Sequence, residues 1–149
     1  DGILFLSLLS GRNPEYLIEH QVNAVPILEK TNLEVIPTAY LLIESGVVTA
    51  VEKVSLTKPL NRDNIGYVSQ TAKASEWMGN KLVYLEAGSG AKKAIPVEMI
   101  AETASKIEIP IIVGGGITTF DGIQQAYKAG ATMVVIGTAF ENNTSFFER

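Results

Sequence analysis

Short apolar runs alternate along the chain with longer stretches in which apolar residues recur at helical spacing. The apolar runs, rich in Ile, Leu and Val, span residues 3–9, 33–42, 82–85, 110–113 and 133–136. Runs of this kind are typical of strands that are buried on both faces of a parallel sheet. The stretches with helical spacing span residues 14–30, 64–78, 96–106 and 118–130. The alternation predicts an α/β fold built from βαβ units around a parallel sheet.

The alternation is less regular between residues 33 and 64. Pro37 lies inside an apolar run and predicts an irregularity near the middle of that strand, because proline cannot donate a ladder hydrogen bond. Gly46 and the alternating apolar residues after it predict a short β-hairpin at 46–54, and residues 57–63 read as a polar loop. In the helix that follows, Trp77 is expected near the buried face.

Three successive predicted strands end in loops that contain glycine. The loops read GSGA at 88–91, GGGI at 114–117 and GTAF at 137–140. In a (β/α)8 barrel the active site lies at the carboxyl ends of the strands, and the loops after strands 7 and 8 often bind phosphate. The glycines therefore favour a (β/α)8 TIM barrel over an open doubly wound sheet, which the alternation alone would also fit. Counted back from these loops, the chain is expected to cover about strands 4 to 8, with residues 1–149 as a single domain and the N-terminal units absent.

The same glycines suggest that the loops bind an anion. Glycine allows backbone N–H groups to approach a phosphate closely, and a helix N-terminus adds free donors and a favourable dipole. The structural alternative is that strand-to-helix turns contain glycine for conformational reasons. Three such loops on one face, with GGG among them, favour the anion-binding interpretation.

Glu86 ends the third apolar run and stands directly before Gly88. A carboxylate at the end of a buried strand needs a partner, because an unpaired buried charge is costly. It could cap a helix or form a salt bridge with Lys92 or Lys93, or it could act as a general base near a bound phosphate ester. Tyr84 is two residues earlier and points to the same side of the strand, where it could bind substrate hydroxyls or belong to the core.

Composition and charge exclude several functions. The net charge is −4, the pI is about 5.0, and the 12 Lys and Arg residues are scattered, so a nucleic-acid partner is not expected. The chain has no cysteine, which excludes thiolate chemistry and fits a cytoplasmic protein, and it has no apolar run of the ~18 residues that a membrane span needs. With His20 as the single histidine, no Ser-His-Asp triad can be built, and no spacing of metal ligands is visible in this chain.

Several motifs together resemble one enzyme family. They are YLEAGSG at 84–90, VGGGI at 113–117, VIGT at 135–138, FLSLLSGRNP at 5–14 and VSLTKPLNRD at 54–63. The chain resembles the geranylgeranylglyceryl phosphate synthase family, which includes the bacterial heptaprenylglyceryl phosphate synthases. The resemblance implies a (β/α)8 barrel that transfers a polyprenyl group from its diphosphate to sn-glycerol 1-phosphate, with Mg2+, and so forms the ether bond of a membrane lipid precursor.

The resemblance also implies roles for individual residues. Glu86 would be the catalytic base that activates the glycerol hydroxyl. The residues that would bind sn-glycerol 1-phosphate are Tyr84, Leu85, Glu86, Ala87, Gly88, Ser89, Gly90, Gly115, Gly116, Gly137 and Thr138. The Mg2+ ligands would lie on the first barrel strands, which this sequence does not contain. Members of the family commonly form dimers or hexamers, so a homo-oligomer is expected.

Two other functions remain compatible with the residues. One is a different phosphate-binding barrel enzyme, such as an isomerase or an indole-glycerol-phosphate-type synthase. Such an enzyme needs a Lys or a second acid at other strand ends, where only Glu86 is clearly placed. The other is a non-catalytic phosphate-binding or assembly module, and the chain could also be inactive by itself.

Overall fold

Five parallel strands form one sheet, in which the order in space is the order in the sequence. The computed structural model describes residues 1–147. The strands are β1 (Gly2–Leu8), β2 (Glu34–Leu42), β3 (Leu82–Glu86), β4 (Ile111–Gly114) and β5 (Met133–Val135). They confirm the five predicted apolar runs and the parallel α/β class. Because every connection steps to the next position in the same direction, right-handed crossovers place the connecting helices on one face of the sheet.

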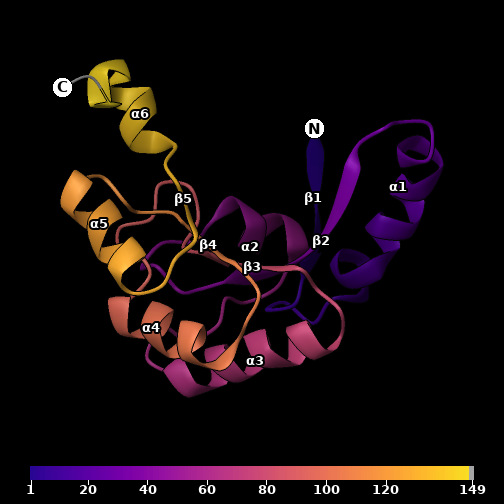
Figure 1. The fold of residues 1–149 in the computed structure, drawn as a ribbon, viewed down its shortest axis with the longest axis horizontal. Coiled ribbons are helices and arrows are strands. Elements are labelled where there is room, and N and C mark those ends of the chain that lie inside the picture. Colours follow the sequence, from indigo (N-terminus) through magenta and orange to yellow (C-terminus); the bar gives the residue numbers. More distant parts are fainter. Residues whose placement is uncertain (148–149) are drawn as a thin grey trace.

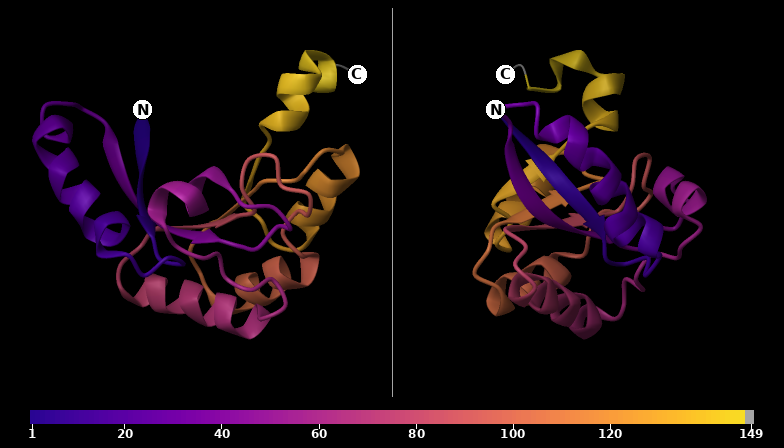
Figure 2. Two further views of the ribbon diagram at one scale, coloured as in Figure 1. Left: turned by 180° about the vertical axis from the view of Figure 1, so that it is seen from behind. Right: turned by 90° about the vertical axis from the view of Figure 1, so that its right-hand side faces the viewer.

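The longer helices lie along the outside of this curved sheet (Figures 1 and 2). A π-helical turn at Glu15–Glu19 leads into α1 (His20–Leu28), and the other long helices are α3 (Ile65–Trp77), α4 (Val97–Lys106) and α5 (Phe120–Lys128). Three shorter elements are α2 (Ala50–Ser55), α6 (Thr138–Asn142) and a 3-10 turn at Thr144–Phe147. In Figure 1, α3 and α4 lie below the sheet and α2 lies near its centre.

The two faces of β3 have different surroundings. Val83 and Leu85 are fully buried in the main apolar cluster, together with residues of α3 and α4 such as Val68 and Met99. The opposite face carries Tyr84 and Glu86, because side chains alternate along a strand. The helix-covered face therefore forms the core, and the other face leads to the polar strand ends.

The face opposite the helices is apolar towards both edges of the sheet. At one edge Leu4 and Leu6 of β1 are 37% and 38% exposed, and at the other Met133 and Val135 of β5 are 41% and 45% exposed. In a doubly wound fold, helices would cover both faces of the sheet. One covered face and a sequential strand order are instead typical of a singly wound, barrel-like arrangement.

The predicted hairpin at 46–54 is wrong, because this segment contains helix α2. Thr49 is the N-cap of α2, and its hydroxyl accepts a hydrogen bond from the Glu52 N–H at 3.2 Å. The sequence signal is the Thr-x-x-Glu pattern, which is the signature of a capping box. The alternating Val48 and Val54 that suggested strands are 59% and 67% exposed, so their spacing does not mark a buried face.

The predicted irregularity at Pro37 is also wrong, because β2 continues through it. The Pro37 carbonyl accepts a hydrogen bond from Lys81 N–H at 2.8 Å, so this residue turns its backbone towards β3. Residue-by-residue pairing between β2 and β3 begins only at Thr38. An N–H at position 37 would point towards the segment that precedes the β2–β3 ladder. The lack of this donor in Pro37 therefore removes no ladder hydrogen bond.

Trp77 is 79% exposed, which contradicts the prediction that it lies near the buried face of α3. The buried residues of this helix include Val68, Ala72 and Ser75. Two residues after Ser75, the helix has turned by more than half a revolution, which places Trp77 on the opposite side.

Candidate functional site

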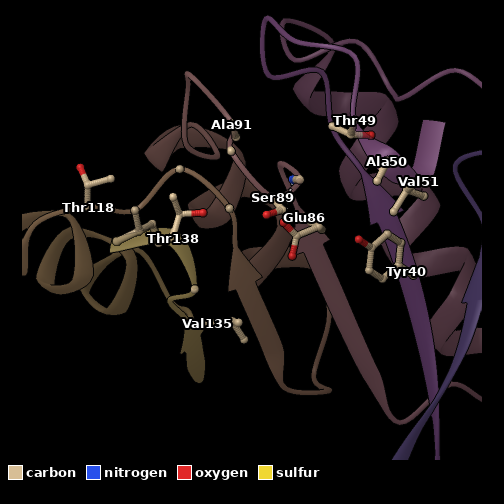
Figure 3. Close-up of a pocket in the computed structure, with 16 residues that line it drawn as sticks. Tyr40, Thr49, Ala50, Val51, Glu86, Ser89, Ala91, Thr118, Val135 and Thr138 are labelled. Atoms are coloured by element: carbon tan, nitrogen blue, oxygen red, sulfur yellow. Dashed lines mark hydrogen bonds between the residues drawn. The ribbon is translucent and has the colours of Figure 1, made fainter. Parts of the chain in front are cut away.

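A pocket of about 400 Å3 opens at the carboxyl ends of the strands (Figure 3). Most of the predicted site residues line it, namely Glu86, Gly88, Ser89, Gly90, Gly115, Gly116, Gly137 and Thr138. The structure therefore brings together the three glycine loops, which follow β3, β4 and β5. Residues that the sequence did not suggest complete the lining, among them Tyr40, Thr49, Ala50, Val51 and Thr118.

Leu85 and Ala87 do not reach this pocket with their side chains. Both are fully buried in the apolar cluster on the helix side of the sheet. The Ala87 N–H also donates to the Gly114 carbonyl at 3.0 Å, which extends the pairing of β3 and β4. These two residues hold the strand end in place, and they can contact a ligand only through their backbone atoms.

The Glu86 carboxylate is buried and held by its own loop. Its side chain is 7% exposed, and Oε1 accepts a hydrogen bond from the Gly88 N–H at 2.6 Å. The Tyr84 hydroxyl lies beside the other oxygen of this carboxylate, since a Cβ on Gly114 would lie 2.6 Å from Glu86 Oε2 and 2.7 Å from the Tyr84 oxygen. Within residues 1–147, Glu86 forms no ion pair with Lys92 or Lys93, whose side chains are exposed. The structure therefore does not support the salt-bridge alternative, and the partners of Glu86 fix its orientation at the pocket wall.

Tyr40 faces Tyr84 across the β2–β3 ladder. The two residues are register partners, and their rings meet edge to face with centroids 5.2 Å apart. Burial raises the pKa of both hydroxyls above the ordinary value, and the nearby Glu86 charge raises the pKa of each further. Both tyrosines consequently stay protonated at neutral pH and can donate hydrogen bonds beside the carboxylate.

Gly115 and Gly116 have a geometry that only glycine fits. Their φ angles are +81° and +72°, which other residues rarely adopt. A Cβ on Gly115 would lie 2.6 Å from Glu86 Oε1, and a Cβ on Gly116 would lie 2.8 Å from the Ala94 N atom. The loop after β4 thus packs its backbone directly against Glu86 and against the loop after β3.

The N-terminus of α2 closes another side of the pocket. Thr49 packs on Gly88 so closely that a Cβ there would lie 2.3 Å from the Thr49 Cγ2 atom. Ala50 and Val51 follow Thr49 and line the same wall (Figure 3). The sequence did not predict this wall, because residues 46–54 were interpreted as a hairpin rather than as a helix.

An apolar groove of about 480 Å3 adjoins the pocket at the strand ends. Tyr40, Ala50 and Val51 line both, so the two hollows share one wall. The groove continues between β1 and the helices, where it is lined by Leu6, Leu8, Tyr16, His20, Gln21, Val54 and Ser55. Tyr16 spans its rim, since its hydroxyl donates to the Val54 carbonyl at 2.9 Å.

The described residues do not form a metal site. No group of three or more His, Cys, Asp or Glu side chains in residues 1–147 is placed to hold a metal ion. Glu86 is the one carboxylate among the described residues that line the pocket, and its Oε1 already accepts a hydrogen bond from the Gly88 N–H. Glu86 is thus a single carboxylate whose Oε1 is already engaged, and no second acid or histidine of the described residues lies beside it to complete a Mg2+ site.

Residues 1–149 match the PcrB family over their whole length. The chain belongs to the PcrB family. The geranylgeranylglyceryl phosphate synthase of Flavobacterium johnsoniae is 66% identical to it over 148 residues, which cover 99% of this chain and 61% of that protein. The geranylgeranylglyceryl phosphate synthase of Pyrococcus abyssi is 40% identical over 148 residues, which cover 99% of this chain and 58% of that protein. The family resemblance predicted from the sequence motifs is confirmed.

The structure of this PcrB-family chain is also similar to a solved synthase. The crystal structure of (S)-3-O-geranylgeranylglyceryl phosphate synthase from Thermoplasma acidophilum, in complex with substrate sn-glycerol-1-phosphate, matches it with a TM-score of 0.92 and 36% sequence identity. The match covers 99% of this chain and 59% of that one. The chain thus spans about three fifths of the length of the relatives that it matches. Among the described residues, no helix has both the length and the apolar character needed to cross a membrane.

The tyrosine pair makes the stability of this PcrB-family chain sensitive to high pH. Phenols that ionise near pH ~10 in the unfolded chain keep their protons longer in the folded one, so the free energy of unfolding should fall as pH rises above ~10. We expect Tyr84→Phe to make this fall less steep, and denaturant unfolding across that pH range measures it. The same slope in wild type and Tyr84→Phe would contradict the buried position of the hydroxyl beside the carboxylate.

Proposed function

We propose that this chain forms the glycerol-phosphate-binding part of a prenyltransferase, which joins a polyprenyl diphosphate to sn-glycerol 1-phosphate. One observation carries the proposal: a pocket formed by the glycine loops and a buried carboxylate shares the Tyr40 wall with an apolar groove. A reaction between a small phosphate ester and a long apolar chain needs two such compartments side by side. The relatives named geranylgeranylglyceryl phosphate synthase support the same assignment.

The proposed fold of the whole enzyme is a (β/α)8 barrel, in which this chain supplies about strands 4 to 8. The sequential parallel order and the single helix-covered face support the barrel. In a closed barrel the half-exposed Leu4, Leu6, Met133 and Val135 would face the interior and edge pairing would be complete. The match to the longer Thermoplasma acidophilum enzyme agrees with this arrangement.

The phosphate would bind in the cradle formed by the three loops. Gly115 and Gly116 bring backbone donors to the pocket wall, and the segments Gly88 to Gly90 and Gly137 to Thr138 line its other sides. Thr119 caps α5 at the end of the GGGI loop, so the positive end of that helix dipole lies next to the cradle. Such a site holds a dianion without requiring a lysine.

Glu86 would accept the proton of the glycerol hydroxyl. In this reaction the hydroxyl oxygen forms a bond to C1 of the prenyl group, and the C1–O bond to the diphosphate breaks, with diphosphate leaving with the electron pair. The hydroxyl proton goes to Glu86, whose orientation is fixed by the hydrogen bond from the Gly88 N–H. A general base in this position typically contributes about 10²–10⁴-fold to the rate.

The polyprenyl chain would lie in the apolar groove. Leu8 at the end of β1, together with Val51 and Val54, provides an apolar lining there, and Tyr40 separates the groove from the phosphate cradle. Burial of apolar surface at about 25 cal/mol per Å2 would hold the chain along this path. The reacting C1 would then lie at the Tyr40 wall, next to Glu86.

Mg2+ is implied by the family, but the described residues do not fit it. We propose that its ligands lie on strands outside this chain. The homo-oligomer, dimer or hexamer, and the cytoplasmic location remain proposals of the same kind. Among the described residues that line the pocket, Glu86 is the one acid and none is a lysine, which favours the transferase over an isomerase or an indole-glycerol-phosphate-type synthase.

Isotope transfer tests this function directly. The whole enzyme proposed above, with the strands that would carry the Mg2+ ligands, is incubated with Mg2+, sn-glycerol 1-phosphate and a prenyl diphosphate labelled in the prenyl group, and we expect label in an ether product. The enantiomer sn-glycerol 3-phosphate is the matched control substrate and should accept less label. If the chain binds glycerol phosphate but transfers no label, it is a binding module rather than a complete transferase.

A further inference from the structure

Arg62 connects two loops that flank the phosphate cradle without lining the pocket itself. Its Nη1 donates to the Glu44 carbonyl at 2.8 Å, and its Nη2 donates to the Ala94 carbonyl at 3.0 Å. Glu44 lies two residues beyond the end of β2, and Ala94 lies in the loop after β3. The guanidinium therefore fastens the loop after β3 to the end of β2.

Hydrogen bonds hold the backbone on both sides of Arg62. The Leu60 N–H donates to the Leu42 carbonyl at 2.8 Å, and the Leu60 carbonyl accepts from the Glu44 N–H at 2.9 Å. Two backbone hydrogen bonds therefore hold Leu60 against the end of β2. The Asn61 side chain accepts from Asp63 N–H at 2.7 Å, which fixes the turn on the other side of Arg62. A side chain anchored in this way can hold a neighbouring loop in one position.

The loop that Arg62 holds is in backbone contact with the cradle. The Ala94 N and Cα atoms lie 2.8 and 3.0 Å from the position that a Cβ on Gly116 would occupy. There is no side chain between them to absorb a shift. A displacement of Ala94 would therefore change the space available to the Gly116 backbone, which the proposed function places against the phosphate.

We propose that Arg62 is a positioning residue for the phosphate site, and that it sets affinity for the phosphate ester through Ala94 and Gly116 rather than by touching the ligand. This inference rests on the proposed function, because it takes the GGG loop as the phosphate contact. A planar guanidinium with several donors in a fixed fork can bond two carbonyls at once, whereas a lysine ammonium is a point charge on a flexible stem. The substitution Arg62→Lys should accordingly keep the positive charge but lose the geometry of the two hydrogen bonds to the Glu44 and Ala94 carbonyls.

The test measures the dissociation constant for sn-glycerol 1-phosphate, and separately for inorganic phosphate, by calorimetry. We expect Arg62→Ala to weaken binding of both by about tenfold, the size associated with one hydrogen bond to a charged group. Arg62→Lys should recover less than half of the lost binding free energy, and millimolar guanidinium ion should strengthen binding to Arg62→Ala. In a transfer assay with Arg62→Ala, KM for the glycerol phosphate should rise while kcat at saturation stays unchanged.

Lys53→Ala is the matched control, because it removes one positive charge from an exposed position on α2. It should bind as wild type and show no response to guanidinium ion. Wild-type affinity in Arg62→Ala, or full recovery in Arg62→Lys, would overturn the positioning role. A wild-type protein that binds neither ligand would instead overturn the proposed function, so the two failures are distinguishable.

Discussion

Replacement of Glu86 by glutamine is expected to lower the rate of ether formation by about 10²–10⁴-fold, the range associated with loss of a general base. Glutamine keeps the size of the side chain and an oxygen that can accept from the Gly88 N–H, which is 2.6 Å from Glu86 Oε1. It cannot take a proton from the glycerol hydroxyl. The loss should therefore appear in kcat, with the dissociation constant for sn-glycerol 1-phosphate changed by a few-fold at most.

The control for this substitution is Glu98→Gln, which makes the same chemical change on the exposed first turn of α4. It should transfer label at the wild-type rate. Single-turnover measurements on Glu86→Gln separate chemistry from product release. Unreduced transfer by Glu86→Gln would refute the assignment of Glu86 as the base and leave it with a structural role in the loop.

Alanine at Gly115 is expected to weaken binding of sn-glycerol 1-phosphate by about 100-fold, which corresponds to about 2.7 kcal/mol. The added Cβ would lie 2.6 Å from Glu86 Oε1 and 2.7 Å from the Gly88 N atom. Both atoms belong to the site, so the loop after β4 must move away from the loop after β3. Calorimetric titration with the ligand measures the change.

Gly46→Ala separates this clash from simple backbone strain. Gly46 has the same φ of +81°, but a Cβ there would meet no atom within 4 Å. Alanine in the left-handed region costs about 1–2 kcal/mol wherever it occurs, so both variants should lose stability. Only Gly115→Ala should lose ligand affinity. Equal affinities in the two variants would contradict the close packing of the three loops as the basis of binding.

The parts of this site that could be predicted from sequence are those with a local signal. An apolar run that ends in Glu86 and breaks into Gly88 and Gly90 already marks a strand end with an unusual acid. The glycines at 114–116 likewise mark a turn that other residues cannot form. Because parallel strands present their carboxyl ends on one edge, these separate signals combine into one site from the sequence alone.

The parts that could not be predicted depend on register and on tertiary contacts. Tyr40 becomes part of the site only because β2 and β3 align it with Tyr84, and nothing near Tyr40 in the sequence sets that alignment. Arg62 bonds two carbonyls that are 18 and 32 residues away along the chain. The α2 wall was different, since Thr49 and Glu52 carried a capping signal that the valine alternation outweighed.

The central claim is that the loops after β3, β4 and β5 bind the phosphate of a glycerol ester. It is tested most directly by titrating the 15N-labelled protein with sn-glycerol 1-phosphate and following the backbone amide signals. We expect saturable shifts at Gly88, Gly90, Gly115, Gly116 and Gly137, which line the pocket, and no shift at Gly46. Shifts absent from these glycines, or concentrated around Gly46 outside the pocket, would contradict phosphate binding by the three loops.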